Sequence, residues 1–144
     1  MARRPDPADQ LFIASVLHGP VAHLFALLPA MDQAHSVRTA RAVEDAVPAR
    51  TDLVRAALLH DVGKAHAGLG VWGRSVASLL AMFHLPVTAH MRIYLEHGAL
   101  GSIDLVQSGE AGIVVAFADG HRSASAPPGI DTADWAVLRR ADDE

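Results

Sequence analysis

Adjacent histidine and aspartate side chains close an apolar segment in the middle of the chain. Residues 56–62 read Ala-Ala-Leu-Leu-His-Asp-Val, and Gly63 and Lys64 follow them. Imidazole and carboxylate are both common metal ligands. The carboxylate of Asp61 would lie at the negative end of a helix dipole, after residues that remove its water, so it needs a nearby cation. Either a metal ion or the ammonium group of Lys64 would supply it. The alternative is that His60 and Asp61 are an ordinary structural pair at a frayed helix end.

The segment that carries His60 and Asp61 has the pattern of a short amphipathic helix. We predict that this helix begins at Thr51, whose hydroxyl can cap it, and ends near Gly63 in a left-handed C-cap. Each member of the pair lies two turns after an apolar residue of the same run. Both are therefore expected on or beside the buried stripe of the helix.

A third candidate ligand, His35, lies on the preceding predicted helix. That helix is expected to run from Gln33 to about Val47, with a cap at Asp32 and an end at Pro48. Beside its core stripe is a face of small residues, which leaves room around the imidazole ring. The alternative is that His35 is a polar residue in the first turn of the helix and makes only ordinary hydrogen bonds. The stripe consists of Val37, Ala40, Val43 and Val47, and the small face of Thr39, Ala42 and Ala46.

His97 lies on a helix predicted to begin after Thr88. Gly101 and Ser102 lie one turn beyond it, and residues of this size permit close approach by another helix or by a ligand. His90 occupies a similar face one heptad earlier. No such small residues follow His90. We therefore interpret it as a surface residue or as a residue that supports the metal ligands without binding the metal.

His121 ends a helix predicted over 110–121 and shares a face with Ile113 and Phe117. A histidine that ends an apolar stripe is commonly a hydrogen-bonded interfacial residue, which is the alternative here. Asp119 lies on a different face and is expected to be solvated.

An aspartate near the end of the chain completes the candidates. We predict a last helix capped by Asp131, with Asp134 in a role like that of a capping box. Asp142 lies on the same stripe of this helix as Trp135. The alternative is that residues 142–144 form a frayed acidic tail, and Asp143 is an adjacent candidate for the same role.

The stretch Leu-Leu-His-Asp-Val-Gly-Lys over residues 58–64 resembles the signature of the HD superfamily of metal-dependent phosphohydrolases, which are all-helical enzymes. The resemblance implies an earlier histidine, a later aspartate and, in members with two metals, two more histidines between them. In those members the signature aspartate bridges the metals. By resemblance, Asp61 would bridge, with one metal also held by His35, His60 and Asp142 and the other by His97 and His121.

Such a ligand set suits one or two divalent ions of Fe, Mn, Zn, Ni or Co. Two ions about 3.5–4 Å apart can generate a hydroxide nucleophile and stabilise both the attacking and the leaving oxygen of a phosphoester. Asp61 and Lys64 are the expected catalytic residues. Lys64 is the best candidate for pairing with substrate phosphate, and Arg38 is a weaker one.

The order of these residues resembles that of HD-type symmetrical dinucleoside-tetraphosphate hydrolases and of HD-GYP cyclic-dinucleotide phosphodiesterases. The chain departs from both: no His-His-Glu doublet or Gly-Tyr-Pro follows His121, and an HTxG form is replaced by His-Arg-Ser-Ala over 121–124. The expected function is cleavage of a phosphoester or phosphoanhydride of a nucleotide or related small molecule. The alternatives are a mononuclear nucleotidase that uses His35, His60, Asp61 and Asp142, a non-catalytic sensor of metal or nucleotide, and a helical interaction protein without metal.

The composition of the chain indicates its fold class and excludes some kinds of site. The chain has 144 residues, 51% of them hydrophobic, which is enough for one domain with a sizeable core. Alanine and leucine are frequent and β-branched residues occur mostly singly, which favours helix. With the resemblance, we expect one all-α, HD-like domain over 1–144: a bundle of about six or seven helices, with the signature region in about 33–144. A net charge of −4 argues against a surface that coats nucleic acid, and the absence of cysteine excludes disulfides and thiolate sites.

The run from Leu11 to Ala30 contains no charged residue, but Gly19 and Pro20 interrupt it. We expect two short helices, near 9–18 and 20–29, packed on the signature region, and no membrane span. Residues 71–85 are expected to form a further helix, and residues 65–70 and 122–130 to form loops. We expect a cytoplasmic protein.

Overall fold

The computed structural model describes residues 4–66, 80–86, 89, 92 and 96–144, and these residues contain helices and no strand. The prediction of an all-α fold is confirmed. The helices whose bounds are defined are α1 (Pro7–Val16), α2 (Pro20–Ala26), α3 (Ala30–Ala46), α4 (Thr51–Leu59), the 3₁₀ helix η1 (Val62–His66), α7 (His97–Gln107), α8 (Gly112–Gly120) and α9 (Thr132–Asp143).

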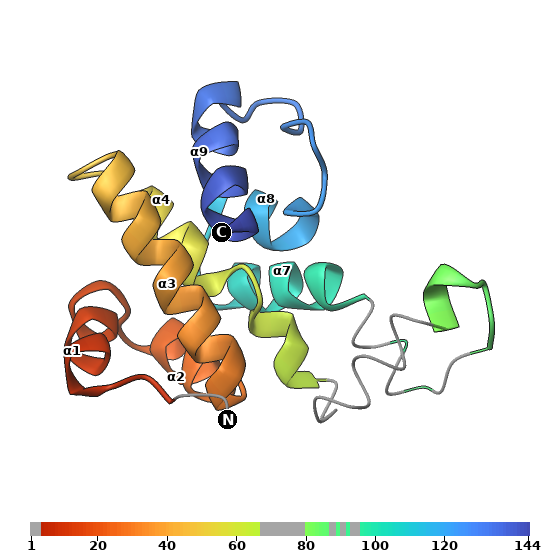
Figure 1. Ribbon diagram of the computed structural model, residues 1–144, viewed down its shortest axis with the longest axis horizontal. Helices are drawn as coiled ribbons and strands as arrows, with labels where there is room; N and C mark the ends of the chain where they lie inside the picture. The colour runs from red at the N-terminus through yellow and green to blue at the C-terminus, as the bar shows by residue number, and fades with distance from the viewer. Residues whose placement is uncertain (1–3, 67–79, 87–88, 90–91, 93–95) are drawn as a thin grey trace.

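Helix α4 is the central element of the fold. It packs against α3 and α8 most extensively, and also against α9, α1 and α2. In Figure 1, α1 and α2 lie on one side of α3 and α4, and α8 and α9 lie on the other. The apolar run of α4 is accordingly buried from Leu53 to Leu59 except for Arg55. The end of this helix is therefore held at the point where the other helices converge.

The core gathers the apolar faces of helices from both halves of the chain. Trp135 of α9 packs edge to face on Phe117 of α8, and the rings' centroids lie 5.2 Å apart. The predicted stripe of α3 is buried at Val37, Ala40 and Val43. This packing supplies the main apolar stabilisation of the described part of the chain.

Close backbone contacts between helices depend on glycine. A Cβ atom at Gly63 would lie 1.8 Å from the carbonyl oxygen of His97, and one at Gly101 would lie 2.9 Å from the backbone nitrogen of Gly63. A Cβ at Gly98 would likewise lie 2.7 Å from the carbonyl oxygen of Asp119. Glycine at these positions lets η1, α7 and α8 approach closely, in agreement with the close approach predicted at Gly101.

The boundaries of the two central helices differ from the predictions. Helix α4 does begin at Thr51, but Arg50 is its N-cap and no side chain caps it. It ends at Leu59 in right-handed geometry, so the predicted left-handed end at Gly63 is wrong. The predicted cap at Asp32 is also wrong, because α3 begins at Ala30, and Asp32 lies buried in its first turn.

Other boundaries shift by a few residues. Helix α1 lies two residues earlier than predicted, and α2 ends three residues earlier. Both start at prolines, which fit the first helical position. Helix α8 begins at Gly112 rather than Glu110, whose carboxylate pairs with Arg55. The cap at Asp131 is confirmed, whereas the carboxylate of Asp134 pairs with Arg50 instead of closing a capping box.

Several predictions fall wholly or partly outside the described residues. They include most of the helix predicted over 71–85, the loop at 67–70, His90 and the start of the helix predicted after Thr88; α7 itself begins at His97. Within the described ranges, every helix is too short or too polar to span a lipid bilayer.

Candidate metal centre

Helix ends bring the six predicted ligands together. His60 and His121 occupy the C-caps of α4 and α8, and His97 is the first residue of α7. Asp61 directly follows His60. His35 comes from the early part of α3, and Asp142 from the last turn of α9. A site built in this way joins segments from most of the described chain.

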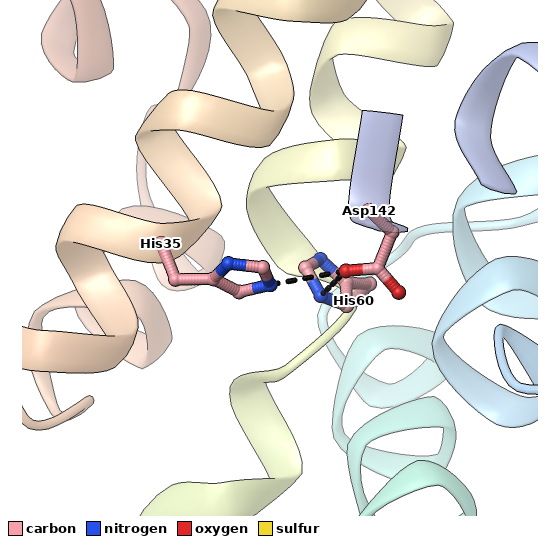
Figure 2. Close-up of side chains that lie close together, drawn as sticks. All are labelled: His35, His60 and Asp142. Carbon is pink, nitrogen blue, oxygen red and sulfur yellow. Dashed lines mark hydrogen bonds and ion pairs between the residues drawn. The ribbon is translucent and has the colours of Figure 1, made fainter. Parts of the chain in front are cut away.

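The first group of side chains is His35, His60 and Asp142, whose candidate ligand atoms all lie within 4.8 Å of one another. The Nε2 atom of His35 lies 3.0 Å from Oδ1 of Asp142, and the Nε2 atom of His60 lies 3.1 Å from the same oxygen. Figure 2 shows both imidazole rings directed at the carboxylate from separate helices. Two ring nitrogens and a carboxylate oxygen that converge in this way are suitable ligands for a transition metal.

The second group is His60, Asp61 and His121, so the two groups share His60. The carboxylate of Asp61 lies close to three histidines. Its Oδ2 atom is 3.4 Å from Nε2 of His60, and its Oδ1 atom is 3.2 Å from Nε2 of His97 and 3.8 Å from Nε2 of His121. The two oxygens of one buried carboxylate thus face different imidazoles, Oδ2 toward His60 and Oδ1 toward His97 and His121.

Hydrogen bonds to the backbone orient the residues of the centre. The Nδ1 atom of His60 lies 2.7 Å from the carbonyl oxygen of Ala57, which fixes the ring with Nε2 toward Asp61 and Asp142. This is the arrangement by which proteins commonly orient a histidine ligand. Arg139 of α9 donates to the carbonyl oxygen of His121 at 2.6 Å, which ties the helix of Asp142 to the end of α8.

The charges of the centre are strongly coupled. Burial opposes a charge on His60, but Asp61 and Asp142 outweigh it and raise the pKa of His60 to about 10. Burial likewise opposes the charge of both carboxylates, yet neighbouring groups hold their pKa values well below the usual range: His60 and His97 act on Asp61, and His35 and His60 on Asp142. Burial, followed by the charge of His60, lowers the pKa of His121 to about 4. The carboxylates are therefore ionised at neutral pH.

The buried polar atoms of the centre fit a bound cation. Nε2 of His60, Oδ1 of Asp61 and Nδ1 of His121 are buried without a hydrogen bond. Buried polar atoms normally have partners, and unsatisfied ones cost free energy. A divalent ion would satisfy the lone pairs of His60 and Asp61 together. The described residues therefore contain a cluster that could hold a metal, as predicted from the residue types.

Lys64 contacts the centre directly. Its Nζ atom lies 2.5 Å from Oδ2 of Asp61 and 3.8 Å from Oδ1 of Asp32. Of the two cations proposed for Asp61, the ammonium of Lys64 is the one in contact with it in this structure. Asp32 was not predicted in this role. Its position one turn before His35 on the same helix face is the signal that could have indicated it.

Other candidates lie apart from the cluster. Asp143 is 67% exposed at its side chain and pairs with Arg139, so Asp142 is the residue that faces the histidines. Arg38 is exposed and lines a separate groove that also contains Asp6 and Asp9. Asp119 is exposed, as expected.

Two neighbouring pockets lie at the end of α8, and the smaller one reaches the histidines. One, of about 310 Å³, is lined by His97, His121 and Arg122 among others. The second, of about 510 Å³, is largely apolar and includes Trp135 and Ile130. Both pockets are lined by Asp119, Gly120 and Ser123, so they share a wall.

The chain matches no protein-family model, and it has no significant match among curated proteins or solved structures. The interpretation of the centre therefore depends on its own residues and geometry.

Proposed function

We propose that the chain is a metal-dependent phosphohydrolase that cleaves a phosphoester or phosphoanhydride of a nucleotide or a related small molecule. The observation that carries this proposal is the position of Asp61. It is a buried carboxylate with one oxygen toward His60 and the other toward His97 and His121. This position fits the bridging role that the resemblance to HD phosphohydrolases implies.

In this proposal His35, His60 and Asp142 hold one ion, His97 and His121 hold a second, and Asp61 contacts both. Bound divalent ions of this kind supply a hydroxide nucleophile at neutral pH and stabilise charge on phosphate oxygens. The chain's own contribution is to fix its donors on converging helix ends and to exclude water around them. His60 and Asp61 are each 1% exposed at the side chain, which supports this assignment.

Lys64 is the proposed partner of the substrate phosphate. Its ammonium group lies beside Asp61. The Lys64 side chain is 14% exposed, so it is largely shielded from solvent but still accessible. A fixed positive charge at this place would stabilise negative charge that develops on phosphate oxygens. Arg38 gains no support for a similar role, because it lines a groove beside Asp6 and Asp9.

The two pockets support a substrate of nucleotide size. The smaller one reaches His97 and His121 and contains the cation of Arg122, which suits phosphate. The larger one offers Trp135, Ile130 and Ala126, which suit a planar apolar group such as a base. A molecule with a phosphate joined to such a group could occupy both.

The proposal is tested by hydrolysis of bis(p-nitrophenyl) phosphate and of a nucleotide panel with Mn²⁺ or Fe²⁺. His60→Ala and Asp61→Ala should each abolish turnover with helicity retained in circular dichroism. His18→Ala and Asp45→Ala, which change exposed residues outside the cluster, serve as matched controls. Turnover that survives both His60→Ala and Asp61→Ala would overturn the assignment.

Three alternatives give different results in these experiments. A mononuclear nucleotidase would bind one ion and keep its turnover in His97→Gln, since the first group of ligands is complete without His97. A sensor would bind metal or nucleotide without turnover. Absence of any bound transition metal after anaerobic preparation without chelators would favour a helical interaction protein.

A further inference from the structure

Lys64 lies near two buried carboxylates from different segments, Asp61 in the turn after α4 and Asp32 in α3. Its Nζ atom is 2.5 Å from Oδ2 of Asp61 and 3.8 Å from Oδ1 of Asp32. The side chains of these two aspartates are 1% and 6% exposed, respectively. Asp32 lies in the first turn of α3, where the helix dipole favours a negative charge. The lysine therefore has a second ionic partner within a short side-chain movement.

The contact between Lys64 and Asp61 conflicts with metal binding. The oxygen that the ammonium group touches, Oδ2, is the one that faces Nε2 of His60. An ion held between His60 and Asp61 would therefore lie close to the ammonium group, and two cations at such a distance in a buried site repel strongly. Lys64 must withdraw from Oδ2 when the ion binds.

Withdrawal would leave a largely buried ammonium group without a partner, unless another carboxylate receives it. An unpaired buried charge is unfavourable, whereas a paired one is tolerated. Asp32 of α3 is a second carboxylate within reach, with its Oδ1 atom 3.8 Å from Nζ of Lys64.

We propose that Asp32 is a positioning residue that receives the ammonium group of Lys64 when Asp61 binds metal. The exchange frees Oδ2 of Asp61 and keeps Lys64 beside the centre. This inference depends on the metal centre of the proposed function, but not on the identity of the substrate.

The test is a double-mutant cycle on the affinity for Mn²⁺, measured in the full chain by competition with a chromophoric chelator. Asp32→Asn should raise the Kd by about tenfold, as expected for loss of one charged partner. Lys64→Met should leave the Kd unchanged or lower it, because the competing ammonium group is gone. In the Lys64→Met background, Asp32→Asn should have little further effect.

Three controls keep the result specific. Asp45→Asn removes an exposed carboxylate from the same helix and should leave the Kd unchanged. Asp32→Glu keeps the charge and should restore most of the affinity. Circular dichroism and the thermal midpoint of the metal-free variants show whether each remains folded. If Asp32→Asn unfolds, Asp32→Glu replaces it in the test, and its Kd is expected to lie near that of the wild type.

The outcomes separate this inference from the proposed function. A wild-type chain that binds no metal would overturn both. Metal binding in the wild type with an unchanged Kd in Asp32→Asn would overturn only the role of Asp32. If Asp32→Asn lowered the affinity equally in the wild-type and Lys64→Met backgrounds, Asp32 would act without the lysine. That result would also overturn the proposed role of Asp32.

Discussion

The carbonyl oxygen of His97 occupies the space that a side chain at position 63 would need. A Cβ atom on Gly63 would lie 1.8 Å from that oxygen, which is far inside van der Waals contact. Gly63 follows Asp61 by two residues in the chain. The absence of a side chain at this position therefore sets the distance between Asp61 and the first turn of α7, which carries His97.

Gly63→Ala should separate η1 from α7 and destabilise the fold by about 3 kcal/mol, as expected for overpacking against backbone that cannot rotate away. It should also weaken metal binding on the His97 side. Urea unfolding measures the first effect and chelator competition the second. Gly120→Ala is the matched control, because a Cβ there would meet only the edge of Trp135, at 3.9 Å. Equal stability of the two variants would contradict the expected contact.

Single changes of the ligands should separate the two halves of the centre. In His97→Gln, binding of the ion on the Oδ1 side of Asp61 should weaken by more than the roughly 10–100-fold that loss of a residue behind a ligand costs, and in His35→Gln the same should hold for the ion beside Asp142. Native mass spectrometry of the Mn²⁺-loaded chain should then show one ion in each variant and two in the wild type. Two ions retained in either variant would contradict the assigned division of ligands.

The stability of the metal-free protein should be greatest near pH 6.5. The pKa of His121 is lowered to about 4 in the folded state, so the unfolded chain binds more protons between that pH and 6.5, and stability rises with pH. The pKa of His60 is raised to about 10, so above 6.5 the folded state binds more protons, and stability falls as pH rises toward 10.

On each side of pH 6.5, the free energy of unfolding should change by up to about 1.4 kcal/mol per pH unit, the value for a single proton. Urea unfolding in the presence of chelator, from pH 4 to 10, measures the profile. His60→Gln should remove the decline on the alkaline side, and an unchanged decline in that variant would assign it to another group.

Metal binding should stabilise the folded chain. At an ion concentration about 100 times the Kd, the gain should be about 2.7 kcal/mol for each site that the unfolded chain lacks. The thermal midpoint should therefore rise on addition of Mn²⁺ and return on addition of chelator. Asp61→Ala should lose the response, since Asp61 contacts both ions in the proposed arrangement. A full response in that variant would locate the bound ion elsewhere.

The cap of α9 should contribute stability without affecting the site chemistry. Asp131 accepts hydrogen bonds from the backbone nitrogens of Ala133 and Asp134, at 2.8 and 3.0 Å. Asp131→Ala should cost about 1 kcal/mol, and Asp131→Asn, which keeps an acceptor, should cost much less. The Kd for metal should change little, because Asp142 lies at the other end of the helix. A large change in Kd would show that α9 transmits strain along its length.

Helical periodicity was sufficient to predict the kind of elements and the residues in the core. The apolar run before His60 is buried, and the stripe of α3 through Val37 and Val43 faces inward. Helix ends were predicted less well, because capping depends on local geometry that several residues can satisfy. Arg50 rather than Thr51 is the N-cap of α4, and Pro29 rather than Asp32 is that of α3.

The sequence alone determined which chemical groups are available and their order along the chain. It placed His35, His60, Asp61, His97, His121 and Asp142 on predicted helices, because residue type and spacing are local properties. Only the tertiary structure decided that these side chains meet, which oxygen of Asp61 faces which imidazole, and that Asp32 lies beside Lys64. Those relationships join residues far apart in the chain, and they depend on how closely helices pack, down to the missing side chain of Gly63.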